Sequence, residues 1–256
     1  MNALEIDGLS VRYGRTRVVD GVSLAVPKGR TVGLVGESGS GKSTIAAAAV
    51  GLVRPESGSI RVDGVEATGG GSAARRARRR MQLVFQDPFS ALDPLMPIGD
   101  SIAEALRATG RRWTRAERIA RVRELLAQVH LDPERAGERP GAFSGGQRQR
   151  ITIARALAGE PSVLIADEVT SALDVSVQGA ILNLLREVQQ DLGLSMLFIS
   201  HNLAVVRYIS DEVCVMRHGT LVESGPTEEL LAHPADPYTR DLLDAVPVLG
   251  ERMHFG

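Results

Sequence analysis

The first 35 residues are built from short segments in which apolar and polar side chains alternate. Alternation of this kind is typical of strands with one buried face. Turn-forming residues at 14–15 and 27–29 separate the segments, so we predict antiparallel strands here. Residues 31–36 are almost wholly apolar, which indicates a strand buried on both faces of a parallel sheet. A glycine-rich loop and an alanine-rich helical run, residues 43–50, follow this strand.

The second half of the chain repeats the combination of a buried strand and a helix. Residues 162–168 and 195–200 are apolar runs of strand length, and residues 177–192 between them have a helical pattern. Strands that alternate with helices predict a parallel sheet. Two hairpins are also expected, at residues 57–67 and 213–225.

Residues 88–158 have the pattern of a helical insert in this α/β chain. Thr114 and Glu117 have the spacing of a capping box, in which each residue satisfies a backbone N–H of the other. An amphipathic helix is expected behind them, because five apolar residues recur at helical spacing: Ile119, Val122, Leu125, Leu126 and Val129. Residues 68–74, which contain three glycines, are predicted to be the least ordered segment.

The composition is that of a globular protein. Of the 256 residues 43% are hydrophobic and 24% are charged, and 30 Lys and Arg against 31 Asp and Glu leave a net charge of -1. A disordered chain would have fewer apolar residues and a larger net charge, and a nucleic-acid-binding protein would have a basic field. The run Arg75–Arg80 is the one nucleic-acid cue. Because it has no interleaved aromatic residues, we interpret it as a solvated or interface patch.

No segment is expected to cross a membrane. The longest apolar stretch, Ile45–Val53, has nine residues, whereas a spanning helix needs roughly 18–20. The first residues also lack the pattern of a signal peptide. Any role at a membrane must therefore come from partner subunits. The single cysteine, Cys214, is expected to pack as a small hydrophobic residue in its alternating apolar segment.

The loop after the buried strand 31–36 satisfies the pattern G-x-x-x-x-G-K-[ST]. Its glycines allow successive backbone N–H groups to surround a phosphate chain, and the helix N-terminus adds a partial positive charge. Lys42 is expected to reach the β- and γ-phosphates, and Ser43 to offer a hydroxyl to Mg²⁺. The pattern predicts a nucleoside triphosphate site but leaves a transporter, a helicase and a GTPase open. The residues expected at the phosphates are Gly36, Glu37, Ser38, Gly39, Ser40, Gly41, Lys42, Ser43 and Thr44.

Two carboxylates, Asp167 and Glu168, end the predicted strand 162–168. The carboxyl ends of parallel strands face the crevice in which open α/β sheets bind ligands. We expect Asp167 to hold Mg²⁺, directly or through water, and Glu168 to polarise the attacking water as a general base.

A second anion-binding feature lies at Ser144, Gly145, Gly146 and Gln147, directly before a helical run. Ser144 is expected to cap that helix, while the glycines expose backbone amides at its positive end. Together with the phosphate loop and the Asp–Glu pair, this feature makes the chain resemble ABC-type ATPases over essentially its whole length. That resemblance implies a P-loop NTPase core with a mainly parallel sheet, an N-terminal antiparallel β-subdomain and an inserted α-helical subdomain. The implied boundaries are 1–87 and 159–225 for the core, 88–158 for the helical part and 226–256 for a C-terminal tail.

The same resemblance implies further site residues. Tyr13 corresponds to an aromatic residue that stacks on adenine, and Gln86 to a loop glutamine that senses Mg²⁺ and the attacking water and abuts a transmembrane partner. His201 corresponds to a switch histidine at the γ-phosphate. Two chains pair head to tail in this family, so Ser144, Gly145, Gly146, Gln147 and Asp174 are expected to reach the ATP of the opposite subunit. Lys42, Gln86, Glu168 and His201 form the implied catalytic set.

Five segments are similar to the branch of ABC ATPases that serves oligopeptide, dipeptide and nickel import: residues 35–44, 79–88, 143–151, 170–178 and 225–247. Two positions depart from that branch, since Val169 stands in place of a proline and Asp236 in place of a histidine. The chain ends at Gly256 without a cysteine-rich extension, so no iron–sulfur cluster is expected.

The resemblance implies ATP and Mg²⁺ as cofactors, a second ABC ATPase and two transmembrane permeases as partners, and a place at the inner face of the cell membrane. An extracytoplasmic solute-binding protein would act indirectly, and no nucleic acid is expected. Two alternatives stay open: a soluble ABC-type ATPase related to nucleic acid or phosphonate metabolism, and a non-catalytic regulatory module. The presence of Lys42, Asp167, Glu168 and His201 argues against the second alternative.

Overall fold

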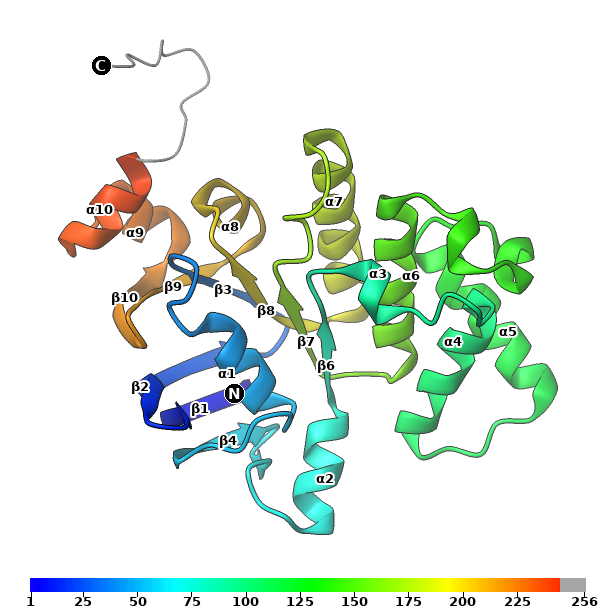
Figure 1. The fold of residues 1–256 in the computed structure, drawn as a ribbon, viewed down its shortest axis with the longest axis horizontal. Coiled ribbons are helices and arrows are strands. Elements are labelled where there is room, and N and C mark those ends of the chain that lie inside the picture. Colours follow the sequence, from blue (N-terminus) through cyan, green and yellow to red (C-terminus); the bar gives the residue numbers. More distant parts are fainter. Residues whose placement is uncertain (245–256) are drawn as a thin grey trace.

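The computed structural model describes residues 1–244, and its centre is a six-stranded sheet (Figure 1). The strand order is β10-β9-β3-β8-β7-β6. The five strands from β9 to β6 are parallel, and β10 pairs with β9 in antiparallel fashion. The strands are β3 (Thr31–Val35), β6 (Met81–Val84), β7 (Val163–Asp167), β8 (Ser195–Ser200), β9 (Glu212–Arg217) and β10 (Thr220–Pro226). The predicted parallel sheet is confirmed, whereas the four-residue strand β6 was not predicted.

A second, antiparallel sheet has the order β2-β1-β4-β5. Its strands are β1 (Asn2–Tyr13), β2 (Thr16–Pro27), β4 (Ser57–Val62) and β5 (Val65–Glu66), as the N-terminal alternation and the first hairpin predicted. The helix α1 (Lys42–Ala49) buries Ile45 in one core cluster with Leu4 of β1 and Leu34 of β3. The same cluster includes Cys214, so its predicted apolar packing is confirmed.

The helical insert lies beside β6 and β7 (Figure 1). It consists of α3 (Pro88–Ala91), α4 (Ile98–Ala105), α5 (Arg115–Gln128), α6 (Gly145–Ala158) and three 3-10 turns, η1 (Leu106–Thr109), η2 (Pro133–Gly137) and η3 (Pro140–Ala142). The capping box of Thr114 and Glu117 is present. Ile119 was predicted in the buried stripe of α5, but its side chain is 53% exposed and lines a surface hollow beside Pro97.

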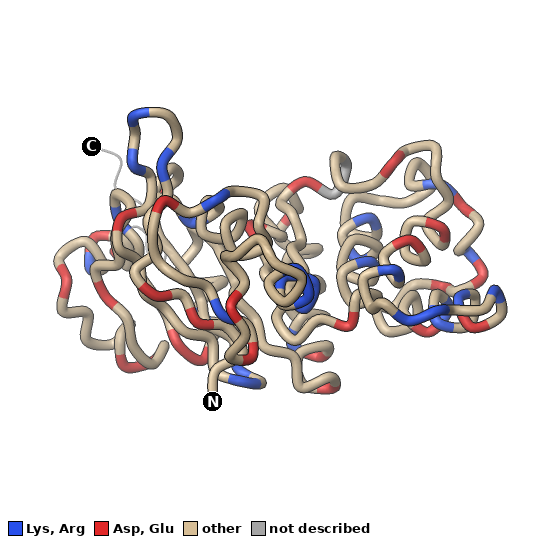
Figure 2. The backbone as a smooth tube through the Cα atoms, turned by 90° about the horizontal axis from the view of Figure 1, so that it is seen from below, with Lys and Arg blue, Asp and Glu red and all other residues tan. Residues whose placement is uncertain are grey.

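The helix α2 (Ser72–Arg79) corrects the prediction of a loose segment over residues 68–74, since Ser72 already begins the helix. Arg78 donates to the carbonyls of Ala67 and Gly69, and Arg80 forms an ion pair with Asp63. Two arginines of the basic run, Arg78 and Arg80, therefore make contacts with other parts of the same chain. Figure 2 shows acidic and basic positions scattered along the whole tube, in keeping with the small net charge.

The remaining helices follow the strands of the central sheet: α7 (Val175–Leu192), α8 (Leu203–Ile209), α9 (Thr227–Ala232) and α10 (Pro237–Asp244). In Figure 1, α9 and α10 lie at the end of the molecule opposite α4 and α5. Across residues 1–244, each helix is too short or too polar to traverse a lipid bilayer. The last part of the predicted C-terminal tail, residues 245–256, lies outside the described residues.

Candidate active site

The phosphate loop connects β3 to α1 and packs tightly against two other strands. A Cβ atom on Gly36 would lie 2.0 Å from the carbonyl oxygen of Met216 in β9, and one on Gly41 would lie 2.8 Å from the carbonyl oxygen of Val18 in β2. Gly41 also has a φ of 107°, which is unfavourable for a residue with a side chain. These two glycines are therefore required by close backbone approach as well as by the turn.

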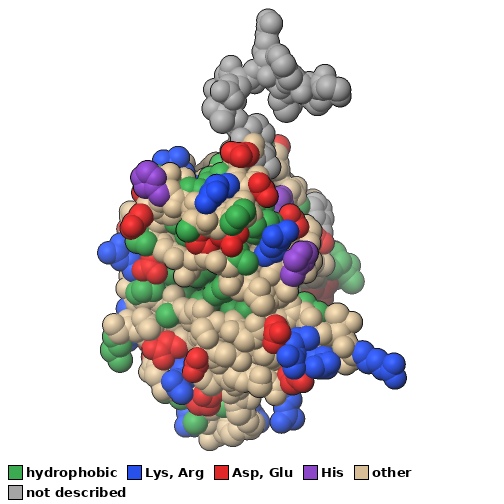
Figure 3. All heavy atoms as spheres, turned by 90° about the vertical axis from the view of Figure 1, so that its left-hand side faces the viewer, with side chains coloured by type: hydrophobic (Ala, Val, Ile, Leu, Met, Phe, Trp, Pro, Cys, Tyr) green, Lys and Arg blue, Asp and Glu red, His purple; other side chains and the backbone are tan. Residues whose placement is uncertain are grey.

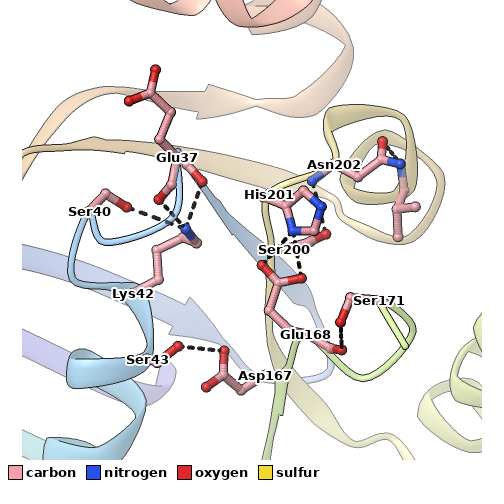
Figure 4. A network of polar contacts seen from close by, with 12 residues as sticks. Glu37, Ser40, Lys42, Ser43, Asp167, Glu168, Ser171, Ser200, His201 and Asn202 are labelled. Carbon is pink, nitrogen blue, oxygen red and sulfur yellow. Dashed lines mark hydrogen bonds and ion pairs between the residues drawn. The ribbon is translucent and has the colours of Figure 1, made fainter. Parts of the chain in front are cut away.

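Lys42 begins α1 and turns its side chain back into the loop (Figure 4). Its Nζ donates to the carbonyls of Gly36 at 2.6 Å and Glu37 at 2.8 Å, and to Ser40 Oγ at 3.3 Å. Burial lowers the pKa of the Lys42 amine below its ordinary value, although nearby carboxylates, first that of Glu168, oppose the shift. A cationic donor is thus fixed inside a loop whose pattern predicts phosphate binding.

Ser43 and Asp167 meet where α1 begins and β7 ends (Figure 4). Ser43 Oγ donates to Asp167 Oδ1 at 3.1 Å. Asp167 is only 8% exposed, and burial raises its pKa, although the hydrogen bond from Ser43 opposes the shift. A hydroxyl and a carboxylate are the oxygen ligands that Mg²⁺ prefers, and Mg²⁺ sites in nucleotide enzymes are completed by substrate phosphates. The donor set therefore fits that ion, and no larger cluster of metal-binding side chains occurs in residues 1–244.

Glu168 and His201 form a direct pair that the sequence did not predict. His201 Nδ1 lies 2.9 Å from both carboxylate oxygens of Glu168. An ionised carboxylate only accepts hydrogen bonds, so Nδ1 must carry the proton. The backbone of Glu168 has a φ of 52° and is fixed on both sides, because its N–H donates to Ile199 at 3.0 Å and Ser171 Oγ donates to its carbonyl at 2.9 Å.

One surface hollow of about 310 Å³ brings together nine of the predicted site residues, from the phosphate loop and from the ends of three strands; Asp167 lies below its lining. Its lining consists of Val18, Ser38, Gly39, Gly41, Lys42, Ser43, Thr44, Gln86, Glu168 and His201. Lys42, Gln86, Glu168 and His201 come from four separate parts of the chain and surround this one hollow. Two of them, Gln86 and Glu168, are the groups expected to act on the attacking water. Tyr13 does not belong to this lining; it ends β1 with its side chain 50% exposed.

The segment Ser144–Gln147 and Asp174 do not line this hollow in the same chain. Ser144 caps α6 as predicted, and Gln147 completes a capping box with it. Asp174 caps α7 by accepting from Val177 N–H at 2.9 Å. Hydrogen bonds from the Ser176 hydroxyl and from backbone N–H groups hold the pKa of Asp174 below its ordinary value. Their predicted action on the ATP of a second chain stays a prediction.

The structure also adds a residue that sequence reasoning missed. Tyr238 of α10 lies beside the phosphate loop, and its hydroxyl accepts from Glu37 N–H at 3.1 Å. The segment around Tyr238 is similar to the peptide and nickel import branch, but no local sequence pattern links Tyr238 to Glu37, which is 201 positions away. Only the folded chain brings them together.

A phosphate loop after a central parallel strand, facing an Asp–Glu pair at the end of another strand of the same sheet, defines a P-loop nucleoside triphosphatase. Within that class, residues 19–171 match the family model described as ABC transporter, and the chain belongs to this family as an ATP-binding, ATP-hydrolysing cassette. The predicted family and fold class are confirmed.

Two relatives place the chain more closely. It is 50% identical over 249 residues to a protein of Brucella ovis named as a peptide import ATP-binding protein, covering 95% of this chain and 78% of the relative. It is 52% identical over 235 residues to the oligopeptide transport ATP-binding protein OppD of Mycobacterium tuberculosis. That second match covers 91% of this chain and 38% of OppD.

Solved structures of ABC cassettes have the same fold. The cbiO1 protein of Clostridium perfringens, described as part of an ABC transporter complex, superposes with a TM-score of 0.81 at 27% identity, covering 91% of each chain. A dimeric ATP-binding cassette in a post-hydrolysis state, bound to ADP and phosphate, superposes with a TM-score of 0.77 at 26% identity. This match covers 88% of the present chain and 98% of the other.

Proposed function

We propose that this chain is the ATP-hydrolysing subunit of an importer for peptides. The observation that carries the ATPase part is the single hollow that joins Lys42, Gln86, Glu168 and His201. The transport part rests on the relatives, which are named for peptide import and oligopeptide transport and match more than 90% of the chain. Because both relatives are named for peptides, a peptide is the proposed solute.

In the proposed reaction, the amides of residues 36–44 and the Lys42 ammonium bind the phosphates of ATP. Ser43 and Asp167 would hold Mg²⁺. A bound Mg²⁺ would neutralise charge on the β- and γ-phosphates. Glu168 accepts a proton from the water that attacks the γ-phosphorus, and Gln86 orients that water. His201 orients the Glu168 carboxylate through Nδ1. Tyr13 is proposed to stack on the adenine.

The proposed active unit is a head-to-tail dimer, either of two copies or of this chain and a paralogue. Ser144, Gly146 and Asp174 lie outside the hollow of their own chain, which supports a role at the ATP of the opposite subunit. A solved cassette with the same fold is also dimeric in its post-hydrolysis state. In the proposed division, the core of 1–87 and 159–225 carries the phosphate loop, and the helical part of 88–158 carries Ser144 and Gly146. Each chain therefore supplies both halves of the dimer site.

Two permeases are the proposed membrane partners, at the inner face of the cell membrane. A groove of about 770 Å³ between α2, β6 and α6 is the proposed contact surface. Leu52 and Phe85 in its lining are exposed apolar side chains, and Gln86 follows Phe85 directly. A permease segment in this groove would therefore reach the residue that orients the attacking water.

The experiment that tests this function is co-expression of the tagged chain with a pair of peptide-importer permeases from the same organism. We expect both permeases to copurify with the chain, and their vesicles, supplied with the cognate binding protein, to take up peptides only when ATP is present. A chain that purifies as an active dimer without permeases, or that copurifies with nucleic acid, would contradict the proposal and favour the soluble ABC-type ATPase.

A further inference from the structure

The C-terminal segment of the chain reaches the phosphate loop through one tyrosine. Tyr238 in α10 is 4% exposed, and its hydroxyl accepts a hydrogen bond from the backbone N–H of Glu37 at 3.1 Å. Glu37 is the second residue of the loop that binds phosphate. The site predicted from the sequence therefore has one more contact, supplied by a segment outside the α/β core.

Tyr238 is itself held in place by neighbouring strands. The Arg217 guanidinium, at the end of β9, lies 4.7 Å from the centre of the Tyr238 ring. Asp236 accepts from the Tyr238 N–H at 2.8 Å, and Glu223 of β10 accepts from the N–H of Asp236 at 3.2 Å. Figure 3 shows this end of the molecule, where acidic, basic and hydrophobic side chains are mixed on the surface. The ring and the peptide of Tyr238 thus have little freedom to move away from the loop.

Glu37 is fixed from two sides. Its N–H donates to Tyr238, while its carbonyl accepts from Lys42 Nζ at 2.8 Å. The two bonds restrain the peptide planes before and after Glu37. The Glu37 N–H shares its peptide plane with the carbonyl of Gly36, which accepts from Lys42 Nζ at 2.6 Å. The position of the Lys42 ammonium therefore depends on the peptide plane that Tyr238 helps to orient.

We propose that Tyr238 is a positioning residue for ATP: it holds the phosphate loop in the conformation that binds nucleotide. This inference rests on the proposed ATPase function. When only a fraction of a protein has the binding conformation, the apparent affinity is the intrinsic affinity multiplied by that fraction. A typical neutral hydrogen bond changes such an equilibrium by about 2- to 12-fold.

The test is Tyr238→Phe, which removes only the hydroxyl and keeps the ring against Arg217. We expect the Kd for ATP to rise, by up to about 12-fold, while kcat at saturating ATP changes little. The Glu37 amide should also exchange its hydrogen faster in the ATP-free protein. Tyr208→Phe is the matched control, because the Tyr208 hydroxyl donates to Asn183 and lies outside the hollow. The control should keep the wild-type Kd and the wild-type exchange at Glu37.

A second variant, Arg217→Gln, removes the cation over the ring but leaves the hydroxyl. It should shift the Kd in the same direction by less. An unchanged Kd in Tyr238→Phe, with or without a lower melting temperature, would overturn the inference and leave Tyr238 a packing residue. Failure of the wild-type chain to bind ATP would instead overturn the proposed function, and the exchange at Glu37 would still report on the hydrogen bond.

Discussion

The substitution Gly146→Ala tests how closely the segment Ser144–Gln147 packs against α7. A Cβ atom at Gly146 would lie 2.4 Å from Val177 Cγ1, well inside van der Waals contact. Val177 is β-branched and lies in the first turn of α7, so it has few alternative rotamers. Gly146→Ala must therefore displace α6 from α7. Overpacking of this kind costs about 1–3 kcal/mol.

Gly145→Ala is the matched control for this change. A Cβ atom there would lie 3.6 Å from Leu173 Cδ2, which is ordinary contact. Both glycines lie in the first turn of α6, so both alanines gain a similar helix propensity, up to about 1 kcal/mol. The difference between the two variants is then the overpacking alone, about 1–3 kcal/mol. In a chain of this size it corresponds to a melting temperature lower by about 2–12 °C.

The assay is urea and thermal unfolding of the wild type and both variants, followed by circular dichroism. Gly145→Ala should unfold at or above the wild-type midpoint, and Gly146→Ala clearly below the midpoint of Gly145→Ala. Because Ser144 and Asp174 cap the two helices at this junction, Gly146→Ala should also lower the ATPase rate of the dimer. Equal midpoints for the two variants would refute the reasoning, since the close approach to Val177 would then carry no cost.

Three further predictions concern the hollow and the core. Glu168→Gln should lower kcat by about 10²- to 10⁴-fold while ATP still binds; phosphate release near the wild-type rate would remove Glu168 as the base. Because burial raises the pKa of Asp167, folding disfavours its charged form, so Asp167→Asn should stabilise the nucleotide-free protein at neutral pH and lose hydrolysis. In thermal unfolding, this advantage should vanish as the pH falls below the ordinary Asp pKa of 3.8; an advantage that persists there would contradict the cause. Burial raises the pKa of Cys214 to about 12, so a disulfide reagent should react only after denaturation, because the thiolate fraction at pH 7 is on the order of 10⁻⁵.

The sequence by itself determined the features whose causes lie within a few residues. The buried strand 31–36, the phosphate loop after it and the cap at Ser144 were all predicted, because periodicity, glycine spacing and capping residues are local signals. Local signals also misled in places. The helix α2 begins at Ser72 because its alanines pack against the core, although three glycines precede it. Ile119 has helical spacing but faces the rim of a hollow.

Only the tertiary structure decided which side chains meet. Ser43 and Asp167 are 124 positions apart in the sequence. They touch because Ser43 follows the loop after β3, Asp167 ends β7, and β8 alone separates these two strands in the sheet. His201 meets Glu168 because each directly follows one of two neighbouring parallel strands, β8 and β7. Tyr238 reaches Glu37 across 201 positions because α9 and α10 return the chain to the loop after β10 has run away from it. Residue pattern fixes the period of a strand, but strand order and register arise from packing of the whole core, so these contacts are not written in any local stretch of the chain.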